Sequence, residues 1–144
     1  MTFEDIQESW AKDCAIDVLN ISGESANTPK LHHKYLRLLV RAKGDLRKTH
    51  TRLAKLKALK HDYFMGIMTK EDLDELGWEP FQLKILKADM SKYIDRDKDV
   101  ITVTTSIGEA QEIVFYLEEV LRQINGRGFQ ISSIIAWEKY QNGG

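Results

Sequence analysis

The spacing of apolar residues in the middle of the chain predicts one long helix. Apolar side chains recur there in steps of three and four residues, which places them on one helical face. We expect Thr28 to cap this helix and Pro29 to be its first residue. Thr49 and Lys60 interrupt the apolar face, and Gly44 is a position where the helix could break or bend. The face comprises Leu39, Ala42, Leu46, Thr49, Leu53, Leu56, Lys60 and Tyr63.

The same periodicity predicts shorter amphipathic helices on both sides of the long one. Thr2 is a plausible cap for the first of them, and Ser106 with Glu109 fits a capping box before another. The residues between the first helix and Thr28 are rich in Ser, Asn and Gly, which is typical of a linker. The expected helices cover residues 3–19, 29–64, 69–77, 80–94, 106–125 and 131–144.

One segment has the composition of a β-strand. Residues 100–105 read Val-Ile-Thr-Val-Thr-Thr, which has high β propensity, and residues 129–131 are the only weak partner for a strand there. The segment fits a short strand or an extended connector. The expected fold class is therefore mainly α, with a long basic helix, amphipathic helices and at most a short β element.

The charge of the chain is unevenly distributed. Residues 30–64 hold eleven Lys or Arg and two acids, a formal charge of +9, while the remaining residues sum to −10. This asymmetry points to a partner with a strongly negative surface, or to pairing between parts of the chain or its copies.

Composition and motifs exclude several classes of function. The single cysteine, Cys14, excludes an intrachain disulfide and cysteine-based metal motifs. No phosphate-binding glycine loop or catalytic zinc motif occurs, and the four histidines lie among bases that repel a cation. No apolar run is long enough to cross a membrane, and the acidic start is not a signal peptide. We therefore expect no enzymatic activity, cofactor, metal or membrane span.

The basic helix has three interpretations: a solvated face of a coiled coil, a membrane-surface helix, or a nucleic-acid-binding element. Thr49 and Lys60 interrupt the broad apolar face that membrane binding needs. Clustered bases favour phosphate binding, and the aromatic residues that follow at once favour single-stranded DNA. The candidate DNA-binding residues are Arg47, Lys48, Arg52, Lys55, Lys57, Lys60, Tyr63 and Phe64.

The C-terminal part carries much apolar surface for so short a chain. Its helices pack within one monomer, or they form an interface between copies that would gather several basic arms into one multivalent site. The expected division is a helical DNA-binding region at 1–66 and a helical oligomerisation region at 67–144. The candidate oligomerisation residues are Val114, Leu117, Leu121, Ile124, Ile131, Ile134, Ile135 and Trp137.

Four blocks of sequence together resemble one family, the UvsY recombination mediators of T-even-like phages. This resemblance implies a non-enzymatic protein in the cytoplasm of the infected bacterium that forms ring-like homo-oligomers and binds single-stranded DNA. It also implies two partners, a RecA-type phage recombinase and the phage single-strand-binding protein, with the recombinase loaded onto DNA that the binding protein coats. The matching blocks are FEDIQESWAKDCAID, LKALKHDYFMG, DKDVI and INGRGFQISSIIAWEKY.

The resemblance extends to the DNA-binding segment of the family. Residues 62–66 match its Asp-Tyr-Tyr/Phe-x-Gly element, and Lys60 falls where the family has Arg. The family's Lys falls on Ala58, so Lys57 carries the same role only if its side chain reaches the same strand. The alternative function is a non-enzymatic helical scaffold whose basic helix binds an acidic protein partner.

Overall fold

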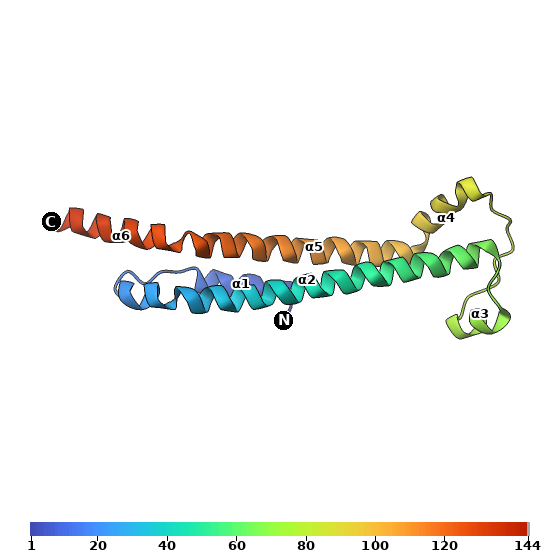
Figure 1. Cartoon of the computed structure of the whole chain (residues 1–144), viewed down its shortest axis with the longest axis horizontal. Helices are drawn as coiled ribbons and strands as arrows, with labels where there is room; N and C mark the ends of the chain where they lie inside the picture. The colour runs from blue at the N-terminus through green and yellow to red at the C-terminus, as the bar shows by residue number, and fades with distance from the viewer. Residues whose placement is uncertain (144) are drawn as a thin grey trace. The chain divides into compact units, whose positions relative to one another are not determined.

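The computed structural model describes residues 1–143 and is almost entirely helical (Figure 1). No strand occurs among these residues, so the mainly α fold class is confirmed and the strands considered at 100–105 and 129–131 are wrong. The elements are α1 (Phe3–Asp13), α2 (Ile21–Met65), α3 (Lys70–Leu76), the 3-10 helix η1 (Lys87–Asp89), α4 (Met90–Arg96), α5 (Lys98–Asn125) and α6 (Arg127–Gln141).

The chain forms two compact units that share the two longest helices. Unit 1 contains the chain up to Lys43 and from Glu112 onward, and unit 2 contains residues 44–111. Each unit thus combines part of α2 with part of α5. These units differ from the functional division at residue 66, which remains a prediction about DNA binding and self-association.

Helix α1 begins where the sequence predicts and ends earlier. Thr2 caps it: the Thr2 hydroxyl accepts from the Asp5 amide at 3.1 Å, and the Thr2 amide donates to the Asp5 carboxylate at 2.8 Å. The helix ends at Asp13 instead of residue 19. The reason is local, because the Asp17 carboxylate accepts from the Leu19 amide at 3.0 Å and so favours a turn over a helix.

Helix α2 begins eight residues before the predicted start. The expected linker at 20–28 is wrong, because α2 starts at Ile21 and Pro29 lies inside it. A β-carbon at Gly23 would lie 2.4 Å from the Asn20 side-chain nitrogen, so glycine leaves room for Asn20 against the first turn. The first turn is also tied to α6, since the buried Arg127 guanidinium donates to the Glu24 carboxylate. The helix continues without interruption through Gly44.

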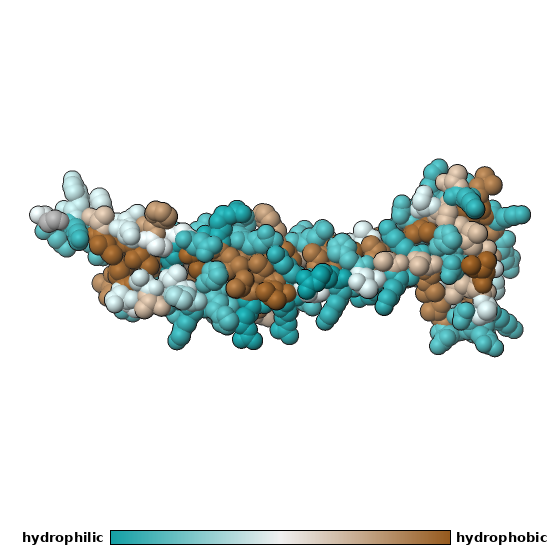
Figure 2. All heavy atoms as spheres, in the orientation of Figure 1, coloured by the Kyte–Doolittle hydropathy of each residue, from teal (hydrophilic) through white to brown (hydrophobic). Residues whose placement is uncertain are grey.

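Unit 1 packs α1 against the first part of α2 through a polar and aromatic contact. The Tyr35 hydroxyl, fully buried, donates to the Asp13 carboxylate at 2.8 Å, and Lys34 forms an ion pair with the same carboxylate. The Trp10 and Tyr35 rings meet edge to face at 5.3 Å. Figure 2 shows apolar residues gathered around α1, with polar residues surrounding them. The buried apolar residues of unit 1 include Ile6, Leu31, Leu39, Leu117, Val120 and Ile124.

Unit 2 contains the second part of α2, the short helices and the start of α5. Gly66 and Gly77 end α2 and α3 in left-handed conformations, with φ of 73° and 69°. The predicted helix over 80–94 is wrong for residues 80–86, which are not helical. The Tyr63 hydroxyl donates to the Glu79 carbonyl at 2.6 Å, and this contact is made by the non-helical backbone leading into that segment.

The β-rich segment of unit 2 is helical, and its hydroxyl groups find partners within the helix. The Thr102, Thr104 and Thr105 hydroxyls each donate to the carbonyl four residues earlier, at 2.8–3.0 Å. The capping box expected at Ser106 is also wrong. The cap is Asp97, whose carboxylate accepts from the Asp99 and Val100 amides at 3.0 and 3.1 Å.

We expect the contact of Asp13 with Lys34 and Tyr35 to make unit 1 sensitive to acid. Burial alone would raise the pKa of Asp13, but the hydrogen bonds from Lys34 and Tyr35 outweigh it and lower that pKa below 3.8. The contribution of Asp13 to the free energy of unfolding is therefore complete above pH 3.8 and is lost as the pH falls through the lower folded value.

The test is urea unfolding of wild type and Asp13→Asn between pH 2 and 7. The variant should be less stable near neutral pH by about 1.5–3 kcal/mol, since it loses hydrogen bonds to a charged group. This difference should shrink at the acid end. Glu8→Gln, on an exposed position of the same helix, is the matched control. A difference that stays constant with pH would show that the Asp13 charge contributes nothing.

Candidate nucleic-acid interface

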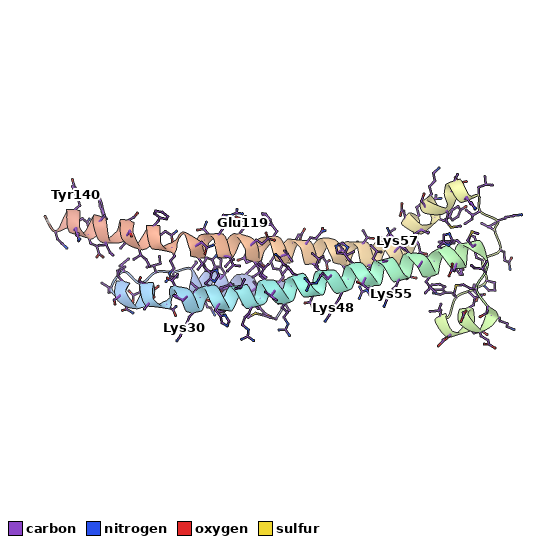
Figure 3. All side chains as sticks on the ribbon, in the orientation of Figure 1. Lys30, Lys48, Lys55, Lys57, Glu119 and Tyr140 are labelled. Atoms are coloured by element: carbon purple, nitrogen blue, oxygen red, sulfur yellow. The ribbon has the colours of Figure 1, made fainter. Side chains whose placement is uncertain are left out.

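Five predicted DNA-binding residues are exposed on the unit 2 part of α2, and three of them form a basic row. Lys48, Arg52 and Lys55 follow one another at spacings of four and three residues and share one helical face. Figure 3 shows Lys48 and Lys55 projecting from α2 into solvent. Arg47 is exposed on one flank of this face, whereas Lys57, nine residues after Lys48, is exposed on the opposite side of the helix. None of the five forms an ion pair with another residue within 1–143, so their charge is available to an anionic ligand.

Lys60 has a different environment from the basic row. Its ammonium group lies 3.1 Å from an Asp97 oxygen and 2.9 Å from an Asp99 oxygen, and its side chain is 6% exposed. The ammonium group also lies 3.9 Å from the centre of the Trp78 ring, within the range of a cation–π interaction. Two carboxylates thus neutralise Lys60, and the exposed position expected for a phosphate contact is not what the structure shows.

The reason for this burial is visible in the sequence pattern. Lys60 occupies an apolar-face position of α2, four residues from both Leu56 and Phe64, so the helix turns it toward the neighbouring segment. An unpaired ammonium group would be costly there, and the Asp97 and Asp99 carboxylates satisfy it.

The two predicted aromatic residues belong to a cluster in the core of unit 2. Phe64 is buried, and its ring lies 5.0 Å from that of Phe81 and 5.8 Å from that of Tyr93. Tyr63 is half-buried and lies 5.1 Å from Trp78. Phe64 is therefore not a free platform for a base, while Tyr63 and Trp78 each keep part of their surface in solvent.

Trp78 is a residue that the sequence interpretation missed. Its signal in the sequence is faint, a single aromatic residue after the helix-ending Gly77. Only the fold brings it to Lys60 and Tyr63, which lie more than a dozen residues earlier in the chain.

The predicted oligomerisation residues divide into two groups. Five of them are buried within unit 1, where they form part of the core of a single chain, while Ile134 is half-buried. Ile135 and Trp137 are exposed on α6, at 38% and 58%. The Trp137 ring stacks on Tyr140 with centres 5.7 Å apart. The buried five are Val114, Leu117, Leu121, Ile124 and Ile131.

Sequence interpretation also missed other exposed apolar residues of unit 1. Phe115 on α5 is 66% exposed, and Phe129 on α6 is 83% exposed. They fall outside the regular apolar stripe, so periodicity alone does not select them.

The described residues offer little for metal binding. Within residues 1–143, no group of three or more His, Cys, Asp or Glu side chains is placed to hold a metal ion.

Among these residues, every helix is too short or too polar to cross a membrane.

Comparison with known proteins identifies one family throughout. Residues 9–144 match the family described as "Recombination, repair and ssDNA binding protein UvsY". The recombination protein uvsY of Enterobacteria phage T4 is 27% identical over 143 residues, which cover 99% of each chain.

Solved structures agree with this match. A crystal structure of the bacteriophage T4 recombination mediator protein UvsY superposes with a TM-score of 0.83 at 26% identity, covering 97% of this chain and 99% of that one. A second lattice of the same protein gives a TM-score of 0.82 at 25% identity, covering 99% and 98%. The chain belongs to the UvsY family of recombination, repair and single-stranded-DNA-binding proteins.

Proposed function

We propose that this chain is a recombination mediator that binds single-stranded DNA through the exposed basic row of α2. The observation that carries the proposal is the exposed charge of this segment: the row of Lys48, Arg52 and Lys55, with Arg47 beside it and Lys57 on the opposite side of the helix, and none of them is neutralised by another residue within 1–143. Phosphate groups reward such a cluster because each contact releases condensed counterions. The family description, which names single-stranded-DNA binding, supports the same assignment.

In this proposal, Lys60 and Phe64 do not contact DNA but stabilise the part of unit 2 that carries the basic row. Lys60 holds the start of α5 and Trp78 next to α2, and Phe64 fills the aromatic core. Tyr63 and Trp78 are half-buried. The exposed parts of their rings contact nucleobases of a strand whose phosphates bind the basic row. Phosphate binding and base contact thus come from neighbouring parts of unit 2.

The mediator role concerns two further proteins. We propose that the chain helps a RecA-type phage recombinase to assemble on DNA that is coated with the phage single-strand-binding protein. It would do so in the cytoplasm of the infected bacterium, through binding alone and without catalysis of its own. The support is the similarity to the recombination mediator of phage T4.

Self-association would raise the affinity of a weak DNA site. We propose a ring-like homo-oligomer in which the exposed aromatic surface of α5 and α6 contacts a neighbouring copy. Phe115, Phe129, Trp137 and Tyr140 offer the area that such a contact needs. An oligomer would present several basic rows to one strand, which increases the overall affinity through effective concentration.

The DNA assignment predicts a change in salt dependence. The triple variant Lys48→Ala/Arg52→Ala/Lys55→Ala should bind oligothymidine more weakly, and the slope of log K against log salt should become shallower by about 2, at roughly 0.7 per lost phosphate contact. Fluorescence anisotropy over a salt series measures both quantities.

The matched control is Lys84→Ala/Lys87→Ala/Lys92→Ala, which removes three exposed lysines of the same unit outside α2. Its slope should stay close to that of wild type. If the two triple variants have equal slopes, the basic row does not contact phosphates, and the scaffold that binds an acidic protein becomes the better interpretation.

The assembly proposal predicts that Phe129→Ser/Trp137→Ser lowers the oligomeric state in sedimentation velocity. The variant should keep its helix content, because both side chains are largely exposed, and should bind long oligothymidine at least about tenfold more weakly through lost multivalency. Leu83→Ser/Leu86→Ser, at exposed positions of unit 2, should keep the wild-type sedimentation. An unchanged sedimentation coefficient for the first variant would place the contact elsewhere.

A further inference from the structure

The unit 1 part of α2 has an exposed face that neither the core nor the basic row explains. This face borders an open groove with a volume of about 860 Å³. Apolar side chains stand along it: Val40 is 61% exposed, Leu36 is 39% exposed, and Met1 adds apolar surface from the N-terminus. We call it the N-terminal groove, lined by Met1, Lys30, His33, Lys34, Leu36, Arg37, Leu38, Val40 and Arg41.

The bases of the N-terminal groove are largely free of partners. Lys34 forms an ion pair with Asp13. Lys30, Arg37 and Arg41 are exposed and form no ion pair with any other residue in the part of the chain that the structure describes. The groove thus combines exposed aliphatic surface with positive charge, and its complement is a ligand that is both apolar and acidic.

The adjacent face of the same helix shows what such a surface binds. There α2 receives α1, an amphipathic helix with acidic residues in its first turn. Trp10 of α1 packs on Tyr35, and the α1 carboxylate of Asp13 meets Lys34. An acidic amphipathic helix is therefore already a partner of α2 within this chain.

Single-stranded DNA fits the N-terminal groove less well. No Phe, Tyr or Trp lines it among the described residues, and the His33 imidazole is the one ring there, so bases would have little surface to stack on. Phosphate contacts to Arg37 and Arg41 would also leave Leu36 and Val40 in water. A helix with apolar residues at spacings of three and four, flanked by acids, covers the aliphatic side chains and neutralises the bases together.

We propose that the N-terminal groove docks an acidic amphipathic helix of a partner protein. The partner's apolar side chains contact Leu36 and Val40, and its carboxylates pair with Arg37 and Arg41. This docking is independent of the DNA-binding row at residues 48–55, which lies in the other compact unit. A partner on the groove and DNA on the basic row can be bound by one chain.

The probe is a fluorescein-labelled 18-residue peptide of Leu and Glu with its leucines at helical spacing. It should bind the full-length protein, and a scrambled peptide of the same composition should bind at least about tenfold more weakly, because it cannot present one apolar face. Arg37→Glu/Arg41→Glu should lose about tenfold or more in affinity and should gain affinity for the corresponding Leu and Lys peptide. Lys84→Glu/Lys87→Glu, an equal change of charge at exposed positions of unit 2, should leave binding of the acidic peptide within about threefold.

A second variant separates the groove from other roles. Leu36→Ser/Val40→Ser keeps the charge of the groove and should lower the affinity for the acidic peptide about tenfold. The affinity for oligothymidine and the sedimentation coefficient should not change. A comparable loss of oligothymidine affinity would identify a nucleic-acid site, and a lower oligomeric state would identify a contact between copies. Either result overturns the proposal, as does equal peptide binding by wild type and both groove variants. Failure of wild type to bind oligothymidine would reject the DNA-binding function alone, since the peptide measurement contains no DNA.

Discussion

The buried ammonium group of Lys60 is the interaction on which unit 2 depends most. It joins α2 to the first turn of α5 through Asp97 and Asp99, and it lies against the Trp78 ring from the segment after α3. The other oxygen of the Asp97 carboxylate accepts the two amide hydrogen bonds that cap α5. Loss of the ammonium group would leave a largely buried carboxylate next to a half-exposed one, and a buried ion pair that loses one partner typically costs about 3–5 kcal/mol, less where a partner is exposed to solvent.

This arrangement separates the basic residues of α2 into one that stabilises the fold and others that remain exposed. Lys60 faces inward and is neutralised by the chain itself, whereas Lys48, Arg52 and Lys55 face solvent and remain available. The division follows from helical geometry, since a residue on the apolar face is turned toward its neighbours whatever its chemistry. The exposed bases can then bind phosphates without weakening the core, and the rigid support behind them limits the conformational entropy that binding costs.

The sequence predicted the elements that depend on local patterns. The mainly helical class, the long helix α2 and the Thr2 cap of α1 follow from periodicity and capping chemistry. The errors occurred where a local cap or a tertiary contact overrides propensity. Residues 100–105 look like a strand but are helical behind the Asp97 cap, and residues 21–28 look like a linker but are held as helix by the pair of Glu24 with Arg127. At the candidate site, the charge pattern located the basic row, but the burial of Lys60 depends on acids that lie almost forty residues later in the chain.

Lysine-reactivity mapping by mass spectrometry tests the division between exposed and buried bases most directly. The full-length protein is acylated under limiting conditions, with and without oligothymidine, and the modification of each lysine is quantified. The account predicts that Lys48 and Lys55 react readily in the free protein and are protected by DNA, while Lys60 stays unreactive in both states and Lys84 reacts equally in both. If Lys60 reacts readily in the free protein and becomes protected by DNA, Lys60 is itself a DNA contact and the account is contradicted.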